Sequence, residues 1–379
     1  MEQKVYCGEN AFSNLPHILK ENNCKQLFLI CGNHVFQIPK IQECIHSLTI
    51  PYVHFSDFTS NPIYEDIKKG VSVFKQTQCD FIVAIGGGST IDVAKCIKEF
   101  VVLNEEENYL EQPCQNSSIP ILAIPTTAGT GSEATQFAVL YENKEKKSLS
   151  HPCLIPEFVI LDSVFLDGLS EYHKKSALLD ALCQCMESYW SVHSTKESKE
   201  LAKKGMQQIL GNVEGYFRNE PEAKNNLLIA ANLSGKAINI TKTTAAHAMS
   251  YRLSTLYGIA HGHAVACCLP YVWEYIANHT ADCLDCRGEN YLLETLNELN
   301  EIFYADSFKD SIKRWNQIVS SLNLPLVVRG TDKEILDLTT SVNVERLSNT
   351  PVTIPEKAIY SMYQQLLADK KKQNNQIVF

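Results

Sequence analysis

The sequence lacks several features that would place it in other classes of protein. No apolar run approaches the roughly 20 residues that a membrane-spanning helix requires. The net charge of -9 argues against nonspecific binding of nucleic acids, so a site for an anion has to be local. The first residues, MEQKVYCGEN, lack the basic and apolar regions of a signal peptide. We therefore expect a cytoplasmic protein that binds neither membranes nor nucleic acids.

Cysteine is plentiful, but its spacing lacks the pattern of a disulfide or zinc framework. The fourteen cysteines are scattered over the whole chain. The nearest approach to a motif, Cys283 with Cys286, is a lone CxxC with no second pair. We interpret the cysteines as reduced thiols of a cytosolic protein.

Two patterns divide the chain, whose 379 residues exceed the usual size of one hydrophobic core. The first part alternates short apolar runs with helical segments, which indicates a parallel sheet covered by helices. The predicted strands cover residues 26–32, 52–58, 80–88, 119–127 and 156–162. After Asp162 the strand signals stop and helical periodicity continues. The sequence predicts a Rossmann-like α/β domain over 1–162 and an all-helical domain over 163–379.

Two loops of small residues follow neighbouring predicted strands. In DFIVAIGGGSTIDVAK a strand runs through three glycines into a helix, and PTTAGTGSEAT follows the next strand. Glycines let a ligand approach the backbone, and the N-terminus of a helix favours a pyrophosphate. Because loops at adjacent strand ends converge on one crevice, they favour a dinucleotide site over two bare turns. Neither GxGxxG nor GxxxxGKS/T is present, so the common fingerprints do not apply.

The predicted dinucleotide site extends beyond the glycines. Its residues are Asn33, Gly86, Gly87, Gly88, Ser89, Thr126, Thr127, Thr130, Ser132 and Lys147. Asn33 lies where many dinucleotide enzymes place an acid on the adenosine ribose, and asparagine does not repel a ribose phosphate. NADP(H) is therefore allowed beside NAD(H), and an ordinary turn asparagine is an equal alternative. Ser132 and Lys147 are candidates by position.

Candidate metal ligands lie in the second part of the chain. Asp180 lies near the start of the helical segment LLDALCQCMESYW, and Gln184 follows it one helical turn later. The segment KTTAAHAMSYRLSTLYGIAHGHA contains His247 and His261. Carboxylate oxygen and imidazole nitrogen suit Fe2+ or Zn2+, and three protein ligands leave a position for a substrate oxygen. Asp180, His247 and His261 would form such a site if the fold brings them together. Structural histidines are the alternative, and spacing does not decide between the two.

These segments together resemble the iron-dependent, or group III, alcohol dehydrogenase family. GGGSTIDVAK, PTTAGTGSEAT, DALCQCMESY, HAMSY and AHGHA follow the family's order over nearly the full length. The resemblance implies a dinucleotide-binding domain, a helical domain, a metal held by Asp180, His247 and His261 in the cleft between them, and a homo-oligomer. Gln184 stands where the family usually has a fourth ligand, a histidine. The coordination number and the choice between Fe2+ and Zn2+ therefore stay open.

The chain departs from many relatives around His247. It has HAMSYR where HAMAHP is common, and Lys242 stands near a usual glycine. Cations close to a catalytic metal favour a substrate with a phosphonate, phosphate or carboxylate group. The predicted substrate-binding residues are Lys236, Asn239, Lys242 and Arg252. For each of them, a solvated or ion-paired side chain is the alternative.

The segments DALCQCMESYWS, GKAINITKTTAAHAMSY and AHGHAVA most resemble one branch of this family. That branch reduces phosphonoacetaldehyde to 2-hydroxyethylphosphonate with a reduced nicotinamide cofactor. The resemblance implies that the metal polarises the carbonyl group and that the nicotinamide delivers the hydride. Tyr251 or His263 would then supply the proton, unless cofactor ribose and water do so. The alternatives are a dehydrogenase of neutral alcohols or polyols, a dehydroquinate-synthase-like lyase, and a nucleotide sensor without activity.

Overall fold

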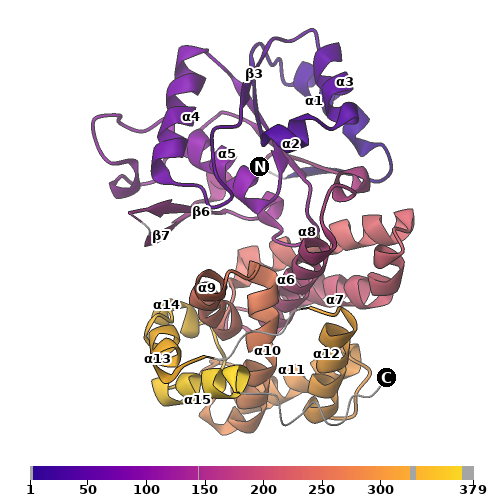
Figure 1. Ribbon diagram of the computed structural model, residues 1–379, viewed down its shortest axis with the longest axis vertical. Helices are drawn as coiled ribbons and strands as arrows, with labels where there is room; N and C mark the ends of the chain where they lie inside the picture. The colour runs from indigo at the N-terminus through magenta and orange to yellow at the C-terminus, as the bar shows by residue number, and fades with distance from the viewer. Residues whose placement is uncertain (1–2, 144, 325–329, 369–379) are drawn as a thin grey trace. The chain divides into compact units, whose positions relative to one another are not determined.

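The computed structural model describes residues 3–143, 145–324 and 330–368. The chain forms two compact units, and each unit combines two stretches of sequence. The first unit contains Met1–Leu169 and Gln208–Asn239, and the second contains Ser170–Gln207 and Ile240–Phe379. The first is an α/β unit and the second is helical, which confirms the predicted fold class (Figure 1).

A six-stranded sheet forms the centre of the first unit, with the strand order β1-β8-β5-β4-β2-β3 and every neighbouring pair parallel. Its strands are β1 (Lys4–Cys7), β2 (Leu27–Cys31), β3 (Tyr52–Phe55), β4 (Phe81–Gly86), β5 (Ile121–Pro125) and β8 (Phe158–Leu161). All five predicted strands are confirmed. The edge strand β1 was not predicted, because KVYC is short and only partly buried. Gly86 pairs with Pro125, so the loops after β4 and β5 start side by side.

Helices cover both faces of this sheet. They are α1 (Leu15–Glu21), α2 (Asn33–Phe36), α3 (Pro39–Ser47), α4 (Tyr64–Gln76) and α5 (Gly88–Phe100). Alternate residues of β2 enter different cores, since Phe28 packs into the cluster with α4 and α5 and Leu29 into the cluster with α1 and α3. Burial on both faces explains why these strands have continuous apolar runs. A separate antiparallel pair, β6 (Phe137–Glu142) and β7 (Glu145–Ser150), was not predicted.

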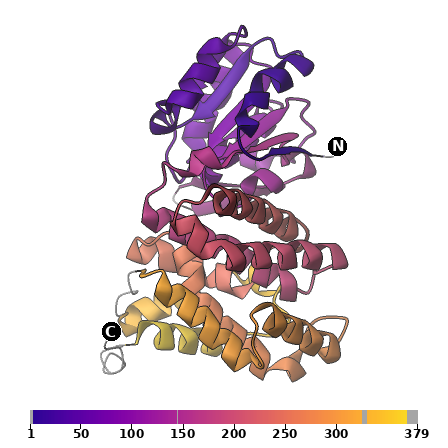
Figure 2. The same ribbon diagram turned by 90° about the vertical axis from the view of Figure 1, so that its right-hand side faces the viewer.

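Helices make up the second unit, and Figures 1 and 2 show them packed side by side. Helix α6 (Glu171–Trp190) is buried at every position from Leu178 onward, and it packs against α10, which also packs against α9. The second unit also contains the helices α9 (Ala245–Tyr257), α10 (His261–Asn278), α11 (Glu289–Ile302), α12 (Phe308–Ser321), α13 (Asp332–Thr340), α14 (Val344–Leu347) and α15 (Glu356–Leu367). Helices α7 (Lys196–Phe217) and α8 (Pro221–Thr241) belong partly to each unit. The sequence EKAIYSMYQQLLADKKK (356–372) predicts a helix that continues past α15, but residues 369–372 lie outside the described residues.

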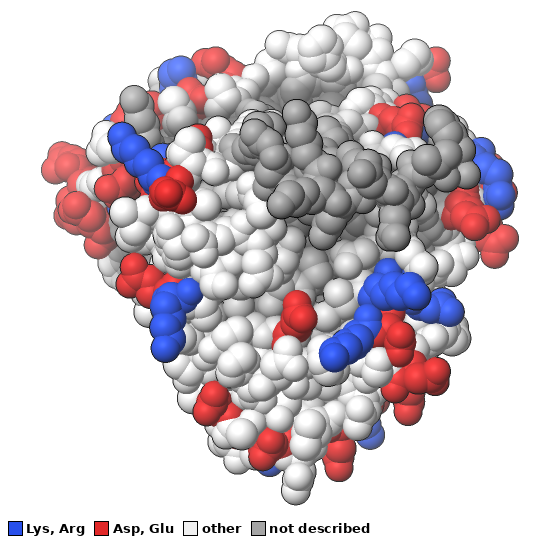
Figure 3. All heavy atoms as spheres, turned by 60° about the horizontal axis from the view of Figure 1, so that its bottom comes forward, with Lys and Arg blue, Asp and Glu red and all other residues white. Residues whose placement is uncertain are grey.

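The surface shown in Figure 3 carries acidic and basic side chains interspersed among uncharged ones. Within the described residues, none of the helices combines the length and the apolar composition that crossing a bilayer requires.

Candidate functional site

Three helices of the second unit bring the predicted metal ligands together. Asp180 comes from α6, His247 from α9, and His261 is the first residue of α10. Oδ1 of Asp180 lies 3.4 Å from Nε2 of His247 and 3.8 Å from Nε2 of His261. Asp180 and His247 are buried, whereas the side chain of His261 is 38% exposed. The group is therefore reachable from the side of His261.

A glycine next to His261 lets α10 pack closely against α6 at the ligands. A Cβ atom on Gly262 would lie 2.0 Å from the carbonyl oxygen of Ser176 and 2.7 Å from Cβ of Asp180. Both distances are shorter than any real contact, so α10 meets α6 here because residue 262 has no side chain. Gly262 in AHGHA is thus required by the packing of α10 against α6, whereas His261 beside it is a candidate metal ligand.

Glu187 fixes the orientation of the His247 ring, with Nε2 toward Asp180. Its buried carboxylate accepts hydrogen bonds from Nδ1 of His247, from Oγ1 of Thr244 at 2.6 Å and from the backbone N–H of Ala246 at 2.8 Å. Burial would raise the pKa of Glu187, but His247 and the other donors outweigh it and hold this pKa below its usual value. Burial lowers the pKa of His247, but Glu187 and Asp180 outweigh it and raise this pKa to about 9, so a metal ion at Nε2 would displace a proton there. Glu187 keeps the hydrogen on Nδ1, which leaves Nε2 as the nitrogen that faces Asp180.

The donor set fits a divalent metal ion. Nε2 of His247 is buried and has no hydrogen bond within the described part of the chain. One carboxylate and two imidazoles suit Fe2+ or Zn2+. Gln184 is buried one turn after Asp180 on the same face of α6. Glu187 was not predicted, although it lies on this face too, two turns after Asp180.

Tyr251 and Arg346 extend the group of ligands outward. The rings of Tyr251 and His261 are stacked, with centroids 5.5 Å apart and planes 2° apart. The guanidinium carbon of Arg346 lies 5.3 Å from the centroid of Tyr251, and its Nη1 donates to Oγ1 of Thr243 at 2.8 Å. Burial raises the pKa of Tyr251 although Arg346 opposes this, so the hydroxyl keeps its proton at neutral pH.

Arg346 was missed by the sequence analysis because α14 lies far along the chain from the histidines. Its side chain is half-buried. Among the described residues, no carboxylate lies within ion-pair distance of its guanidinium group, whereas Arg252 is bound by Asp337. Arg346 is thus an uncompensated positive charge close to the ligand His261.

His263, the other predicted proton donor, faces a different partner. It is buried in α10, and its Nδ1 lies 3.3 Å from the hydroxyl oxygen of Tyr172, which also accepts a hydrogen bond from the backbone N–H of Ala260 at 2.8 Å. Burial lowers the pKa of His263, so its imidazole is neutral at neutral pH. Tyr172 was not predicted.

The predicted substrate residues lie in different surroundings. Nη2 of Arg252 lies 2.7 Å from Asp337, and both side chains are nearly half exposed. Lys242 is exposed in the link between α8 and α9, where its backbone has φ of 59°. In the first unit, Asn239 accepts a hydrogen bond from the backbone N–H of Gln136 at 2.8 Å, and Lys236 is half-buried on α8.

The two small-residue loops meet in the first unit. A Cβ atom on Gly86 would lie 2.2 Å from Oγ1 of Thr90, and one on Gly88 would lie 2.9 Å from Oγ1 of Thr130. Gly88 is the first residue of α5, so the N-terminus of this helix opens between the loops. The arrangement leaves backbone N–H groups for an anionic ligand, as the sequence predicts.

A buried lysine fixes the second loop. Nζ of Lys95 donates to the backbone oxygen of Ser132 at 2.6 Å and to that of Phe137 at 2.7 Å, and burial lowers the pKa of Lys95 to about 8. Oγ of Ser132 donates to Asp92 at 2.7 Å, so the Ser132 side chain is turned into the protein. Lys95 was not predicted, although it ends the motif GGGSTIDVAK.

The remaining predicted cofactor residues lie around this centre. Asn33 is exposed at the start of α2, and Lys147 is half-buried on β7 in an ion pair with Glu145 at 2.9 Å. The hydroxyl group of Ser89 donates to the carbonyl oxygen of Ser60. Thr126 is buried and donates its backbone N–H to Gly86 at 3.0 Å, while Thr127 is half-buried.

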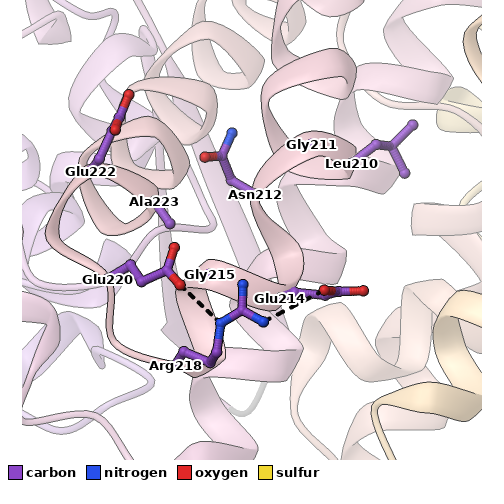
Figure 4. Close-up of a pocket in the computed structure, with 9 residues that line it drawn as sticks. All are labelled: Leu210, Gly211, Asn212, Glu214, Gly215, Arg218, Glu220, Glu222 and Ala223. Carbon is purple, nitrogen blue, oxygen red and sulfur yellow. Dashed lines mark hydrogen bonds and ion pairs between the residues drawn. The ribbon is translucent and has the colours of Figure 1, made fainter.

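A polar hollow at the turn between α7 and α8 contains none of the predicted residues (Figure 4). Arg218 lies there between Glu220, at 2.8 Å, and Glu214, at 3.7 Å. Its charge is thus already compensated.

Comparisons with known proteins identify the family of this chain. Residues 2–163 match the family described as iron-containing alcohol dehydrogenase, and residues 175–366 match the C-terminal part of the Fe-containing alcohol dehydrogenase family. The chain is 31% identical over 277 residues to the phosphonoacetaldehyde reductase of Streptomyces viridochromogenes, covering 69% of either chain. It is 26% identical over 293 residues to the lactaldehyde reductase of Escherichia coli, covering 74% of this chain and 76% of the relative.

A solved structure of the sulfoacetaldehyde reductase from Bifidobacterium kashiwanohense in complex with NAD+ has the same fold. It matches with a TM-score of 0.83 at 23% identity, covering 97% of each chain. The two family matches together span most of the sequence. The chain is therefore an oxidoreductase that belongs to the iron-containing alcohol dehydrogenase family.

Proposed function

We propose that this enzyme reduces a small aldehyde carrying an anionic group, with phosphonoacetaldehyde as the substrate and 2-hydroxyethylphosphonate as the product. The observation that carries the proposal is Arg346, a half-buried guanidinium group against Tyr251 that has no carboxylate partner among the described residues. A neutral aldehyde needs no such charge, whereas a phosphonate is bound well by arginine. The similarity to a phosphonoacetaldehyde reductase supports the choice of anion.

Asp180, His247 and His261 would hold Fe2+ or Zn2+, with Gln184 as a candidate fourth ligand. When bound, the metal ion polarises the carbonyl group of the aldehyde. Glu187 holds the Nδ1 hydrogen of His247, so that Nε2 is available as a donor. Because His261 is the exposed member of the group, the substrate would approach from its side.

The loops of the first unit would bind NAD(H) or NADP(H). Backbone N–H groups at the start of α5 and the hydroxyl groups of Thr127 and Thr130 would contact the pyrophosphate. Lys95 keeps the second loop in place from inside the protein. The reduced nicotinamide supplies the hydride. The NAD+ bound by the sulfoacetaldehyde reductase of the same fold supports this class of cofactor.

Tyr251 is the proton donor that we propose, with His263 as the alternative. Tyr251 keeps its proton at neutral pH and stacks on a metal ligand. His263 is hydrogen-bonded to Tyr172 instead. Tyr251→Phe should therefore lower kcat more than His263→Asn does. The homo-oligomeric state and the cytoplasmic location stay predictions.

A substrate comparison with matched arginine variants tests the proposal. NADH and NADPH oxidation is followed with phosphonoacetaldehyde and with propionaldehyde, on protein loaded with Fe2+ or Zn2+. We expect Arg346→Ala to raise KM for phosphonoacetaldehyde by about 10- to 100-fold, because one charge-assisted hydrogen-bonding group is lost. KM for propionaldehyde should change little. Arg218→Ala, which removes an arginine already paired with glutamates, should change neither value.

Each other outcome points to a different function. Equal turnover of the two aldehydes by the unmodified enzyme would leave a reductase of neutral aldehydes. Equal effects of Arg346→Ala on both substrates would exclude Arg346 as the anion-binding residue. Absence of NAD(P)H oxidation with either aldehyde would favour the lyase alternative, whose net reaction consumes no reduced cofactor.

A further inference from the structure

A second cluster of metal-binding side chains lies within the first unit. Glu99, His151 and Cys153 offer a carboxylate oxygen, an imidazole nitrogen and a thiol, and one ligand atom from each lies within 4.8 Å of the others. Sγ of Cys153 is 3.3 Å from Oε2 of Glu99 and 2.9 Å from Nδ1 of His151. Glu99 comes from the end of α5, whereas His151 and Cys153 follow β7.

The loop after the short helix η2 (Tyr109–Glu111) also reaches this cluster. Gln115 in this loop donates its backbone N–H to Oε1 of Glu99 at 2.5 Å, and its carbonyl oxygen lies 3.3 Å from Sγ of Cys153. Three separate segments therefore converge on one carboxylate.

The charge of Glu99 is not compensated by a basic side chain. Glu99 is fully buried, and among the described residues neither lysine nor arginine lies within ion-pair distance of it. The neighbouring Lys98 is bound to Glu157 instead, at 2.5 Å. Buried carboxylates normally have a cationic partner or a metal ion. The cluster thus combines an unmatched negative charge with metal-binding groups.

We propose that Glu99, His151 and Cys153 bind a second divalent metal ion of the thiophilic class, Zn2+, that is separate from the ion at Asp180. A thiolate with an imidazole favours Zn2+ over Mg2+ or Ca2+, and three protein ligands leave a fourth position for water. Binding displaces the proton of the Cys153 thiol, so that one Zn2+ enters, one proton leaves and no electrons are transferred. The ion would tie the connection after β7 to α5.

The spacing of the side chains is compatible with such an ion after a small adjustment. Tetrahedral ligands at about 2.0–2.3 Å from zinc lie about 3.3–3.8 Å from one another. The contacts of 3.3 Å and 2.9 Å are at or slightly below this range. Without the ion, burial and Glu99 raise the pKa of Cys153 to about 12, so its thiol keeps the proton and donates it to Glu99.

Cobalt titration of the metal-free full-length protein tests this site without any measurement of activity. Cobalt(II) bound by thiolate has a charge-transfer absorption, whereas a site of one carboxylate and two imidazoles has none. We expect this absorption, at one equivalent, in the unmodified protein and in Asp180→Ala. Cys153→Ser should abolish it. Cys79→Ser, which changes a buried thiol of the same unit outside the cluster, should leave it intact.

Zinc content provides the second readout. After loading with Zn2+ and removal of free metal, Cys153→Ser should contain one equivalent less per chain than the unmodified protein and should keep its circular dichroism spectrum. No thiolate absorption in the unmodified protein would overturn the proposal. Retention of the absorption in Cys153→Ser, or its loss in Asp180→Ala, would overturn it as well.

Discussion

The substitution Glu187→Gln tests how the protein prepares its metal site. Glutamine keeps the size of the side chain, and its carbonyl oxygen can still accept from Thr244 and from the backbone of Ala246. Its amide nitrogen, however, would face Nδ1 of His247, where the carboxylate now accepts a hydrogen. Two donors cannot bond to each other, so His247 would move its hydrogen to Nε2. The nitrogen that faces Asp180 would then have no lone pair for a metal ion.

The expected loss follows from this change of tautomer. Groups that hydrogen-bond a ligating histidine contribute about 10- to 100-fold to metal affinity, which is about 1.4–2.8 kcal/mol. The loss of metal affinity in Glu187→Gln should lie toward the upper end of this range, because the carboxylate is fully buried and solvent cannot replace it. Ligands and fold otherwise stay in place, so the metal-free variant should have the circular dichroism spectrum of the unmodified protein.

Metal affinity is measured by competition with a chelator for Fe2+ or Zn2+. Glu298→Gln is the matched control, since it makes the same exchange in the same unit at a half-exposed carboxylate bound to Lys199. It should leave the affinity unchanged. An affinity of Glu187→Gln within twofold of the unmodified protein would refute the role of Glu187 in setting the tautomer.

Three further substitutions have defined outcomes. Gly262→Ala should destabilise the protein by about 2–4 kcal/mol and weaken metal binding, because its Cβ would lie 2.0 Å from a backbone oxygen of α6. Unfolding in urea measures the stability and chelator competition measures the metal affinity, and unchanged values would contradict the prediction. Lys242→Gly should raise the stability by about 0.5–1 kcal/mol, since φ is 59° there and glycine adopts this conformation without strain; a lower melting temperature would contradict this. Lys95→Met should lower the free energy of unfolding by about 3–5 kcal/mol and weaken nucleotide binding, because it leaves the half-buried Asp92 and the loop oxygens without their cation. Wild-type stability in urea would contradict it.

The strands and the motif loops were predictable because their signals are local. Most of the predicted strands are apolar runs buried on both faces, such as LFLIC in β2 and FIVAIG in β4, whereas YVHF in β3 is only partly buried. The strand β7, EKKSLS, was not predicted because it is largely exposed and has no apolar run. The helix α6 was predictable from its strong helical periodicity, although its burial from Leu178 onward was not.

The site was predictable only where chemistry and motif coincide. Asp180, His247 and His261 are residues that bind metals, and they stand in recognisable segments. Arg346 and Tyr172 carry no local signal, because each acts through a neighbour that is distant in sequence: Tyr251 for Arg346, and His263 for Tyr172. The cluster at Glu99 was missed for the same reason, since three segments meet there.

By itself, the sequence determined five strands of the central sheet, the helical second part, the loops that suit a dinucleotide and the three candidate metal ligands, because each depends on neighbours within a few residues. Only the tertiary structure decided which distant segments meet. Residues 208–239, which follow the first helices of the second unit in sequence, belong to the first unit. There Gly131 and Gly235 come so close that a Cβ atom on Gly235 would lie 2.3 Å from the oxygen of Gly131. The tertiary structure also places Arg346 against Tyr251 and Glu187 against His247. Such contacts depend on packing between helices, which no short stretch of sequence encodes.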